Sequence, residues 1–196
     1  CWLAAVLGGC SPQPRTPAPS LVLVTVDTLR ADHLGVYGHF NETSPQLDAW
    51  AATGVRFEDA TVQWPKTWPS MASMLTGLYP DQTGVRAGGT TALADDFTTL
   101  AERMRASGRQ TAAVVSNLNL GRAMGFAQGF DHFVESWEEE YRRRGGTGIF
   151  DDRTGGVKEY TDAKRVTDQA LRWLAVRDPD RPFFLWVHYM DPHGPY

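Results

Sequence analysis

Residues 65–80 read PKTWPSMASMLTGLYP, a pattern in which a loop stops at the head of a helix. A residue that precedes proline avoids helical backbone angles, so we expect Thr67 and Trp68 to be extended and the helix to begin near Pro69. Apolar side chains then recur at helical spacing until Gly77, which favours the end of the helix. Thr67 is thus predicted to lie just outside a helix N-terminus, where free N–H groups and the helix dipole favour an anion.

The hydroxyl of Thr67 has two interpretations. Beside a bound anion it is a candidate nucleophile. Serine and threonine are also common helix caps, and a capping role for Thr67 or Ser70 explains the stretch better when it is taken alone. The choice depends on which other polar side chains the fold brings to this helix.

A strand buried on both faces is predicted at residues 20–26, SLVLVTV, because a continuous β-branched run is typical of a central parallel strand. Asp27 follows this run directly. Open α/β sheets bind ligands at the carboxyl ends of their strands, so Asp27 is a candidate site residue. The alternative is that Asp27 caps the turn that follows.

Strands and helices alternate along the rest of the chain. We expect helices at residues 44–54, 96–107 and 161–176, strands at 55–62, 111–115 and 182–189, and an aromatic loop at 121–133. This alternation predicts an α/β fold with a mostly parallel central sheet.

The last predicted strand leads directly into Asp191 and His193. Because the carboxyl ends of parallel strands lie at one edge of a sheet, we expect Asp27, Thr67 and this pair to share one cleft. A carboxylate, a hydroxyl at a helix head and an imidazole together suit metal-assisted transfer of an anionic group.

The first residues differ in character from the domain that follows. Residues 1–10 resemble the end of a secretory signal, and residues 7–10, LGGC, resemble a bacterial lipobox in which Cys10 is lipidated. A plain signal peptide is the alternative. Residues 11–19 are rich in proline and read as an extended tether, so the domain is predicted at 20–196. We therefore expect an exported bacterial envelope lipoprotein, in the periplasm or at the cell surface, held to the membrane by its N-terminal lipid alone.

The composition of the chain limits the kinds of partner and cross-link that we expect. Of 196 residues, 21% are charged and the net charge is -4, so a nucleic-acid partner is not expected. The cysteines are Cys1 and Cys10, both before the predicted domain, which excludes a disulfide or a cysteine metal site within it.

Several stretches, in family order, resemble the sulfatases of the alkaline phosphatase superfamily. They are LVLVTVDTLRADHLGVYG (21–38), TSPQLDAWAATGVRFEDA (43–60), TWPSMASMLTGLYPDQTGV (67–85), TLAERMRASGRQTAAVVSN (99–117), GFDHF (129–133) and PFFLWVHYMDPHGPY (182–196). The resemblance implies an alkaline-phosphatase-like three-layer sandwich with helices on both faces of the sheet.

The resemblance also implies roles for individual residues. Asp27 would bind a divalent metal ion (Ca, Mg, Mn or Zn), and Thr67 would occupy the nucleophile position and contact the same ion. His193 would bind the anionic group of the substrate. The family's later metal ligands lie beyond Tyr196, so we expect the N-terminal portion of the catalytic domain. The chain lacks an initiator methionine, so we also expect a fragment at its start.

The chain departs from the family at several positions. Thr67 stands where sulfatases carry the Cys or Ser that is oxidised to formylglycine, and threonine cannot form that aldehyde. Met71 replaces the arginine that supports formylglycine, and Thr28 replaces the second of two adjacent aspartates. The family's Lys-x-His element is not evident at residues 116–120, SNLNL.

These departures favour phosphate over sulfate chemistry. We expect a metal-dependent hydrolase of sulfuric or phosphoric esters, acting on a small-molecule, glycan or lipid ester through attack by Thr67. The alternatives are a phosphotransferase on envelope substrates and a catalytically inactive, envelope-anchored binding protein. A third interpretation is that this fragment is never made as a stable protein, because a sheet cut after residue 196 would leave an apolar edge and an incomplete core.

Overall fold

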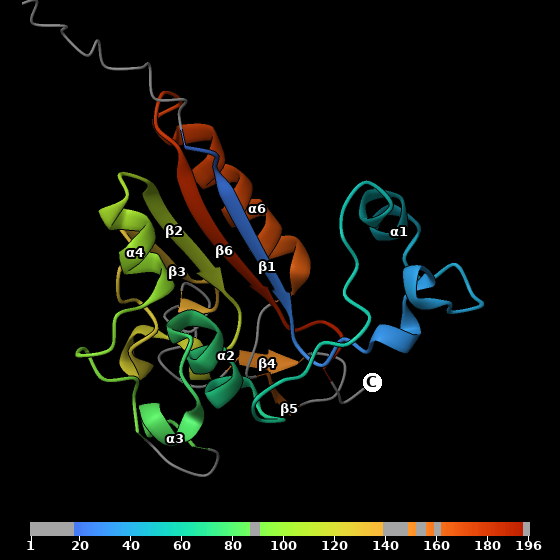
Figure 1. Cartoon of the computed structure of the whole chain (residues 1–196), viewed down its shortest axis with the longest axis horizontal. Coiled ribbons are helices and arrows are strands. Elements are labelled where there is room, and N and C mark those ends of the chain that lie inside the picture. Colours follow the sequence, from blue (N-terminus) through green and yellow to red (C-terminus); the bar gives the residue numbers. More distant parts are fainter. Residues whose placement is uncertain (1–17, 87–90, 139–148, 152–155, 159–161, 194–196) are drawn as a thin grey trace, which may run out of the picture.

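A computed structural model describes residues 18–86, 91–138, 149–151, 156–158 and 162–193. Its centre is a four-stranded parallel sheet in the order β1-β6-β2-β3 (Figure 1). The strands are β1 (Leu21–Val26), β2 (Gln110–Val115), β3 (His132–Glu135) and β6 (Phe183–Tyr189). A separate antiparallel pair consists of β4 (Ile149–Asp151) and β5 (Gly156–Lys158).

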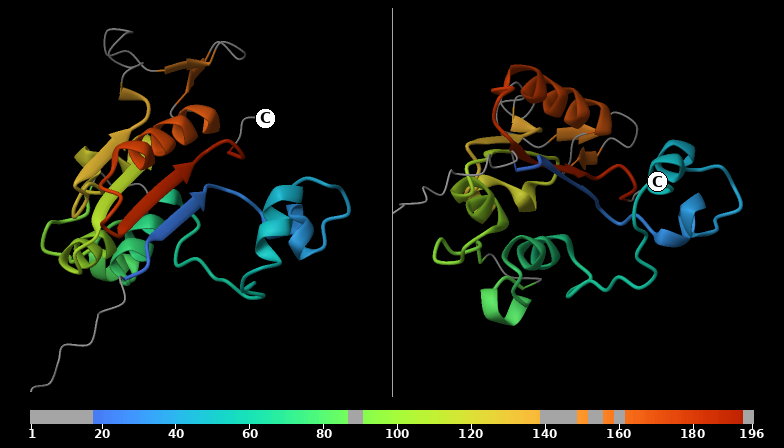
Figure 2. Two further views of the ribbon diagram at one scale, coloured as in Figure 1. Left: turned by 90° about the horizontal axis from the view of Figure 1, so that it is seen from above. Right: turned by 45° about the horizontal axis from the view of Figure 1, so that its top comes forward.

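Helices cover both faces of this sheet (Figure 2). One face carries α6 (Ala163–Val176), and the other carries α2 (Thr67–Thr76) and α4 (Leu100–Ala106). The shorter elements are α1 (Pro45–Ala51), α3 (Pro80–Thr83) and the 3₁₀ turns η1 (Ala31–His33), η2 (Gly35–Tyr37), η3 (Leu118–Leu120) and η4 (Arg122–Met124). The predicted α/β fold, with a parallel sheet between helices, is confirmed. Within the described part of the chain, no helix has the length and apolar character needed to cross a membrane.

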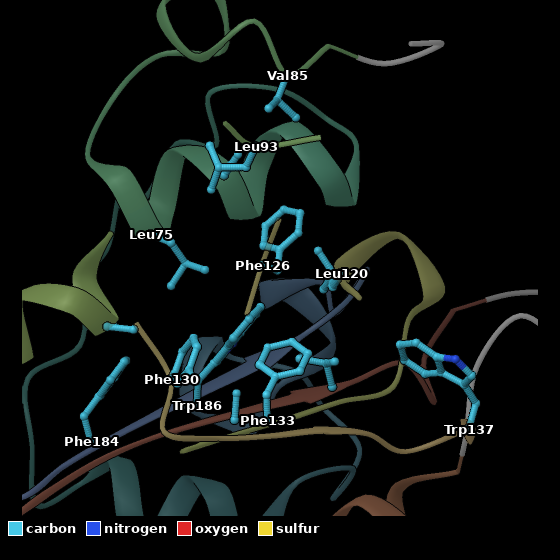
Figure 3. Packing of buried hydrophobic residues seen from close by; sticks show 14 residues of the cluster. Leu75, Val85, Leu93, Leu120, Phe126, Phe130, Phe133, Trp137, Phe184 and Trp186 are labelled. Atoms are coloured by element: carbon cyan, nitrogen blue, oxygen red, sulfur yellow. The ribbon is translucent and has the colours of Figure 1, made fainter. Parts of the chain in front are cut away.

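Two cores result from the alternation of side chains along the strands. On β6, Phe184 and Trp186 point toward α2 and α4, where they join a cluster rich in aromatic rings (Figure 3). Leu185 and Val187 point the other way and pack with Val166 of α6. The aromatic cluster also contains Leu75, Leu93, Leu120, Phe126, Phe130 and Phe133.

The prediction that the first strand is central and buried on both faces was wrong. In the described part of the chain β1 lies at the edge of the sheet, and Val22 and Val24 are 52% and 53% exposed. The cause is the position of α6, which packs over β2 and β6. A β-branched run predicts a strand, whereas its burial depends on what covers it.

Two other predictions also need correction. Residues 55–62 form no strand, and the apolar residues that suggested one, Val55 and Phe57, are exposed. Helix α4 begins at Leu100 rather than at residue 96. It begins there because Thr99 caps it: Thr99 Oγ1 accepts a hydrogen bond from the Glu102 N–H at 3.2 Å, and the Glu102 carboxylate accepts one from the Thr99 N–H at 2.7 Å.

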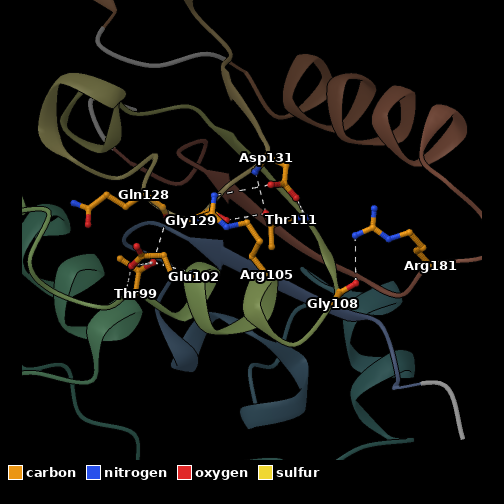
Figure 4. A network of polar contacts seen from close by, with 9 residues as sticks. All are labelled: Thr99, Glu102, Arg105, Gly108, Thr111, Gln128, Gly129, Asp131 and Arg181. Carbon is orange, nitrogen blue, oxygen red and sulfur yellow. Dashed lines mark hydrogen bonds and ion pairs between the residues drawn. The ribbon is translucent and has the colours of Figure 1, made fainter. Parts of the chain in front are cut away.

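The turn before β3 is fastened to both α4 and β2 (Figure 4). The Thr99 hydroxyl donates to the Gln128 carbonyl at 3.2 Å, and the Thr111 hydroxyl donates to the Gly129 carbonyl at 2.8 Å. Gly129 has a φ of +82°, and a Cβ on this residue would lie 2.3 Å from the backbone nitrogen of Glu102. The close approach of this turn to α4 therefore requires glycine.

We expect Gly129→Ala to destabilise the fold by about 2–4 kcal/mol, because it adds a steric clash to left-handed strain. Gly108→Ala is the matched control: its φ is +89°, but nothing lies within 4 Å of the added Cβ. That variant should lose only about 1 kcal/mol. Urea denaturation of both variants measures the difference, and equal losses would contradict the close approach.

Candidate active site

The predicted nucleophile and the predicted metal ligand are in direct contact. Thr67 Oγ1 donates a hydrogen bond to Asp27 Oδ2 at 2.5 Å. Asp27 directly follows β1, and its N–H donates to the Tyr189 carbonyl at the end of β6, at 2.9 Å. These two bonds hold the strand carboxylate against the first turn of α2. The Thr67 hydroxyl therefore binds Asp27 and caps no helix N–H group, so the helix-capping interpretation of Thr67 is not supported.

Helix α2 begins earlier than predicted. Its first residue is Thr67, and the N-cap is Lys66, which is extended (φ −147°, ψ 143°) and makes no side-chain cap. The prediction that Thr67 and Trp68 are extended was therefore wrong. Pro69 fits within the first turn because the N–H groups there have no partner inside the helix, and the conformational restriction before proline is only a preference. Gly77 ends the helix, as predicted.

A cavity of about 470 Å³ opens at the head of α2. Asp27, Thr67 and His193 all line it, so the structure brings the three predicted site residues together. His193 follows β6 and is held by its N–H, which donates to the Met190 carbonyl at 2.8 Å. The shared edge of parallel strands explains this convergence.

Other lining residues set the character of the cavity. Lys66 adds a second basic side chain beside His193, and sequence reasoning missed it although it directly precedes Thr67. Met71 also lines the cavity, so an apolar side chain lies where the resemblance to the sulfatases implies an arginine.

The backbone at Thr28 is strained. Thr28 lines the same cavity and has a φ of +56°, the one positive value among the non-glycine residues that the structure describes. A β-branched residue rarely adopts this conformation, which costs roughly 1–2 kcal/mol. Such strain is concentrated at functional sites.

Asp191 was predicted to share the cleft with His193, but its carboxylate lies at the start of α6 instead. Its carboxylate accepts a hydrogen bond from the Ala163 N–H at 3.0 Å, at the start of α6. A carboxylate at a helix N-terminus is stabilising, and this bond anchors the loop that follows β6. Asp191 thus holds the loop that carries His193 and does not line the cavity.

Sequence reasoning also missed His188, a buried imidazole behind the site. His188 lies on β6 directly opposite Thr25 of β1, and its Nδ1 is 2.9 Å from Thr25 Oγ1. Its Nε2 lies 3.8 Å from Asp27 Oδ2. Burial lowers the pKa of His188 to about 4, and the charge of Asp27 opposes that shift. The imidazole is therefore neutral at pH 7.

Two side chains at the cavity carry oxygen atoms of the kind that bind divalent metal ions. Asp27 and Thr67 present oxygen atoms, the donors that hard divalent cations prefer. Among the described residues, no group of three or more His, Cys, Asp or Glu side chains lies close enough together to hold a metal ion.

The fold and the site together define a class of protein. A parallel sheet that carries a carboxylate, a helix-head hydroxyl and an imidazole at its carboxyl edge is typical of enzymes that transfer anionic groups. The sequence profile of the family named Sulfatase matches residues 19–196, and the chain belongs to this family.

Known relatives agree with this membership. An arylsulfatase of Clostridium perfringens is 26% identical over an aligned region of 212 residues, gaps included. The match covers 90% of this chain and 44% of the relative. A structure solved in complex with D-glucosamine-2-N,6-O-disulfate matches 89% of this chain and 35% of its own, with a TM-score of 0.70 and 23% identity. The phosphonate monoester hydrolase of Agrobacterium radiobacter matches 91% of this chain and 42% of its own, with a TM-score of 0.68 and 24% identity. The chain therefore spans less than half the length of each of these relatives.

We expect the free energy of unfolding of the metal-free protein to fall as the pH drops from about 6.5 toward 4. An unfolded histidine binds its proton near pH 6.5, whereas folded His188 does so only near 4, so the unfolded state binds more protons in this window. The stabilisation is complete above the window, and its loss by pH 4 is on the order of 3 kcal/mol.

Urea denaturation over this pH range, on the wild type and on His188→Gln, isolates the contribution of His188. The variant keeps the other titrating groups, so the difference between the two curves should grow smaller as the pH falls. Parallel curves would contradict a buried neutral His188.

Proposed function

We propose that this chain forms part of an ester hydrolase in which Thr67 is the nucleophile and phosphate esters are preferred over sulfate esters. The observation that carries the proposal is the 2.5 Å hydrogen bond from Thr67 Oγ1 to Asp27 Oδ2. It orients the hydroxyl at the edge of the cavity, so that the oxygen lone pairs are held ready for attack.

The surroundings of Thr67 suit an anionic ester. The hydroxyl lies in the first turn of a ten-residue helix, where free N–H groups and the helix dipole attract negative charge. Lys66 and His193 add basic groups to the walls of the same cavity. Together these features stabilise the charge that develops on the oxygens of the transferred group.

The preference for phosphate follows from what Thr67 can do chemically. Threonine cannot become formylglycine, and apolar Met71 stands in place of the arginine that supports that group. Direct attack remains: a bond forms between Thr67 Oγ1 and phosphorus while the bond from phosphorus to the ester oxygen breaks. The departing alkoxide takes up the proton that Thr67 releases and leaves as the alcohol, and water then hydrolyses the phosphothreonine to threonine and inorganic phosphate.

The proposal includes a divalent cation with Asp27 as one ligand. When bound, such an ion supplies positive charge that makes the Thr67 hydroxyl easier to deprotonate and offsets the charge of the ester. The oxygen donors of Asp27 and Thr67 favour calcium or magnesium, while manganese and zinc are tested in parallel.

The relatives support the breadth of this chemistry. An arylsulfatase and a phosphonate monoester hydrolase are both similar to this chain, so related folds occur in enzymes named for sulfate esters and for phosphonate monoesters. Fold alone does not decide between them. A sulfated sugar, present in one of the similar structures, represents the competing substrate class.

A second candidate is an envelope protein that binds anionic groups without turnover. The specific observation in its favour is Met71, which leaves the cavity without the arginine of the sulfatases. The contact between Thr67 and Asp27 argues against it, because binding alone does not require an oriented hydroxyl.

We expect Thr67→Ala to reduce turnover of an aryl phosphate to background, because it removes the attacking oxygen. The assay pairs aryl phosphate with aryl sulfate in the presence of calcium, magnesium, manganese or zinc. Thr76→Ala is the matched control: it removes a threonine hydroxyl from the same helix, where that group bonds to the Ala72 carbonyl at 2.7 Å.

The outcomes separate the candidate functions. Loss of activity in Thr67→Ala alone supports the nucleophile, and faster phosphate than sulfate turnover supports the preference. Faster sulfate turnover would overturn the preference, and equal activity in Thr67→Ala and the wild type would overturn the nucleophile. Binding of phosphate without any turnover would favour the second candidate.

We also propose that the protein is an envelope lipoprotein anchored through Cys10, which lies outside the described residues. In a bacterial host that processes lipoproteins, Cys10→Ala should abolish incorporation of labelled palmitate and release the protein from the membrane fraction. A wild type that takes up no palmitate and is released as readily as the variant would indicate a plain signal peptide instead.

A further inference from the structure

A row of buried polar side chains lies behind the active site. Trp186 Nε1 donates to Thr25 Oγ1 at 3.0 Å, and Thr25 Oγ1 lies 2.9 Å from His188 Nδ1. Trp186 and His188 are completely buried, and Thr25 is 7% exposed. We call Trp186, Thr25 and His188 the support triad.

The position of the support triad follows from strand geometry. Successive side chains alternate between the faces of a strand, so Thr25 and Asp27 point to the same side of β1. The parallel register places Thr25 directly opposite His188, and Trp186 precedes His188 by two residues on the same face. The triad and Asp27 therefore lie on one face of the sheet, on the side of α2.

Counting hydrogens determines the tautomer of His188. The indole N–H can only donate, so it occupies one lone pair of Thr25 Oγ1. The single hydroxyl hydrogen of Thr25 then needs an acceptor, and within the described residues that acceptor is His188 Nδ1. A hydrogen on Nδ1 would leave the Thr25 hydrogen buried and unbonded, which is unfavourable. The hydrogen of the imidazole is thus on Nε2.

That N–H lies near the carboxylate of Asp27, at a distance longer than a hydrogen bond. His188 Nε2 makes no hydrogen bond within the described part of the chain, and Asp27 Oδ2 lies 3.8 Å away. The same oxygen accepts the hydrogen bond of Thr67. Asp27 Oδ2 is therefore flanked by the Thr67 hydroxyl and by an unused N–H of a fixed imidazole.

We infer that the support triad is a positioning device for Asp27. Trp186 and Thr25 fix the tautomer of His188, and His188 presents its Nε2–H to Asp27 and so sets the direction in which the carboxylate holds Thr67. None of the triad touches the substrate. Its effect on turnover rests on the proposed function, whereas its tautomer does not.

The first test reads the tautomer directly. Long-range ¹H–¹⁵N correlation spectra of the ¹⁵N-labelled chain should show His188 protonated at Nε2, with the signals identified by their loss in His188→Gln. Thr25→Ser should keep this tautomer, because it keeps the hydroxyl. Thr25→Val, of nearly the same shape, should lose the preference. A hydrogen on Nδ1 in the wild type would overturn the inference.

The second test measures how the support triad affects turnover through Thr67. On the preferred ester, Thr25→Val should lower kcat about 10-fold with little change in KM. Thr25→Ser, which retains a hydroxyl, should keep the kcat of the wild type. Unfolding curves establish that both variants remain folded under assay conditions. An unchanged kcat in folded Thr25→Val would overturn the positioning role. If the wild type itself shows no turnover, the proposed function fails, and the tautomer still decides the arrangement of the triad.

Discussion

The parallel pairing of β1 with β6 is the constraint on which the site depends. It places Thr25 opposite His188 and lets the N–H of Asp27 donate to the Tyr189 carbonyl. Because side chains alternate along a strand, a register shift of one residue would turn every side chain of β1 to the opposite face. Asp27 would then point away from α2 and lose its hydrogen bond with Thr67. The arrangement of the candidate site therefore depends on the sheet register as much as on the residues themselves.

Much of the candidate site could be predicted from the sequence, for a reason that lies in α/β architecture. Asp27 directly follows a strand, Thr67 begins a helix and His193 lies in the loop after a strand, and local patterns reveal such positions. Parallel strands then bring these positions to one edge without any knowledge of detailed contacts. The Thr25–His188 pair could not be found this way, since 163 residues separate its members and only the register joins them. A buried apolar run predicts a strand but not its neighbour.

The fold predictions failed where tertiary context overrides local pattern. The β-branched run of β1 indicated burial, yet Val22 and Val24 are exposed because α6 packs over the neighbouring strands. Local preference also misplaced the start of α2, since a proline in the first turn is compatible with an earlier start. The sequence thus indicated whether a segment is a helix or a strand in these cases. The burial of each element and the residues at which it begins and ends depended on the packing of other elements.

The left-handed backbone at Thr28 has a consequence for how this cavity can change over evolutionary time. The resemblance to the sulfatases implies an aspartate at this position, and aspartate tolerates a positive φ far better than a β-branched residue does. The main chain at this point thus has a conformation that aspartate adopts more readily than threonine. A single substitution separates this cavity from one with two adjacent aspartates, and that step would relieve strain rather than create it.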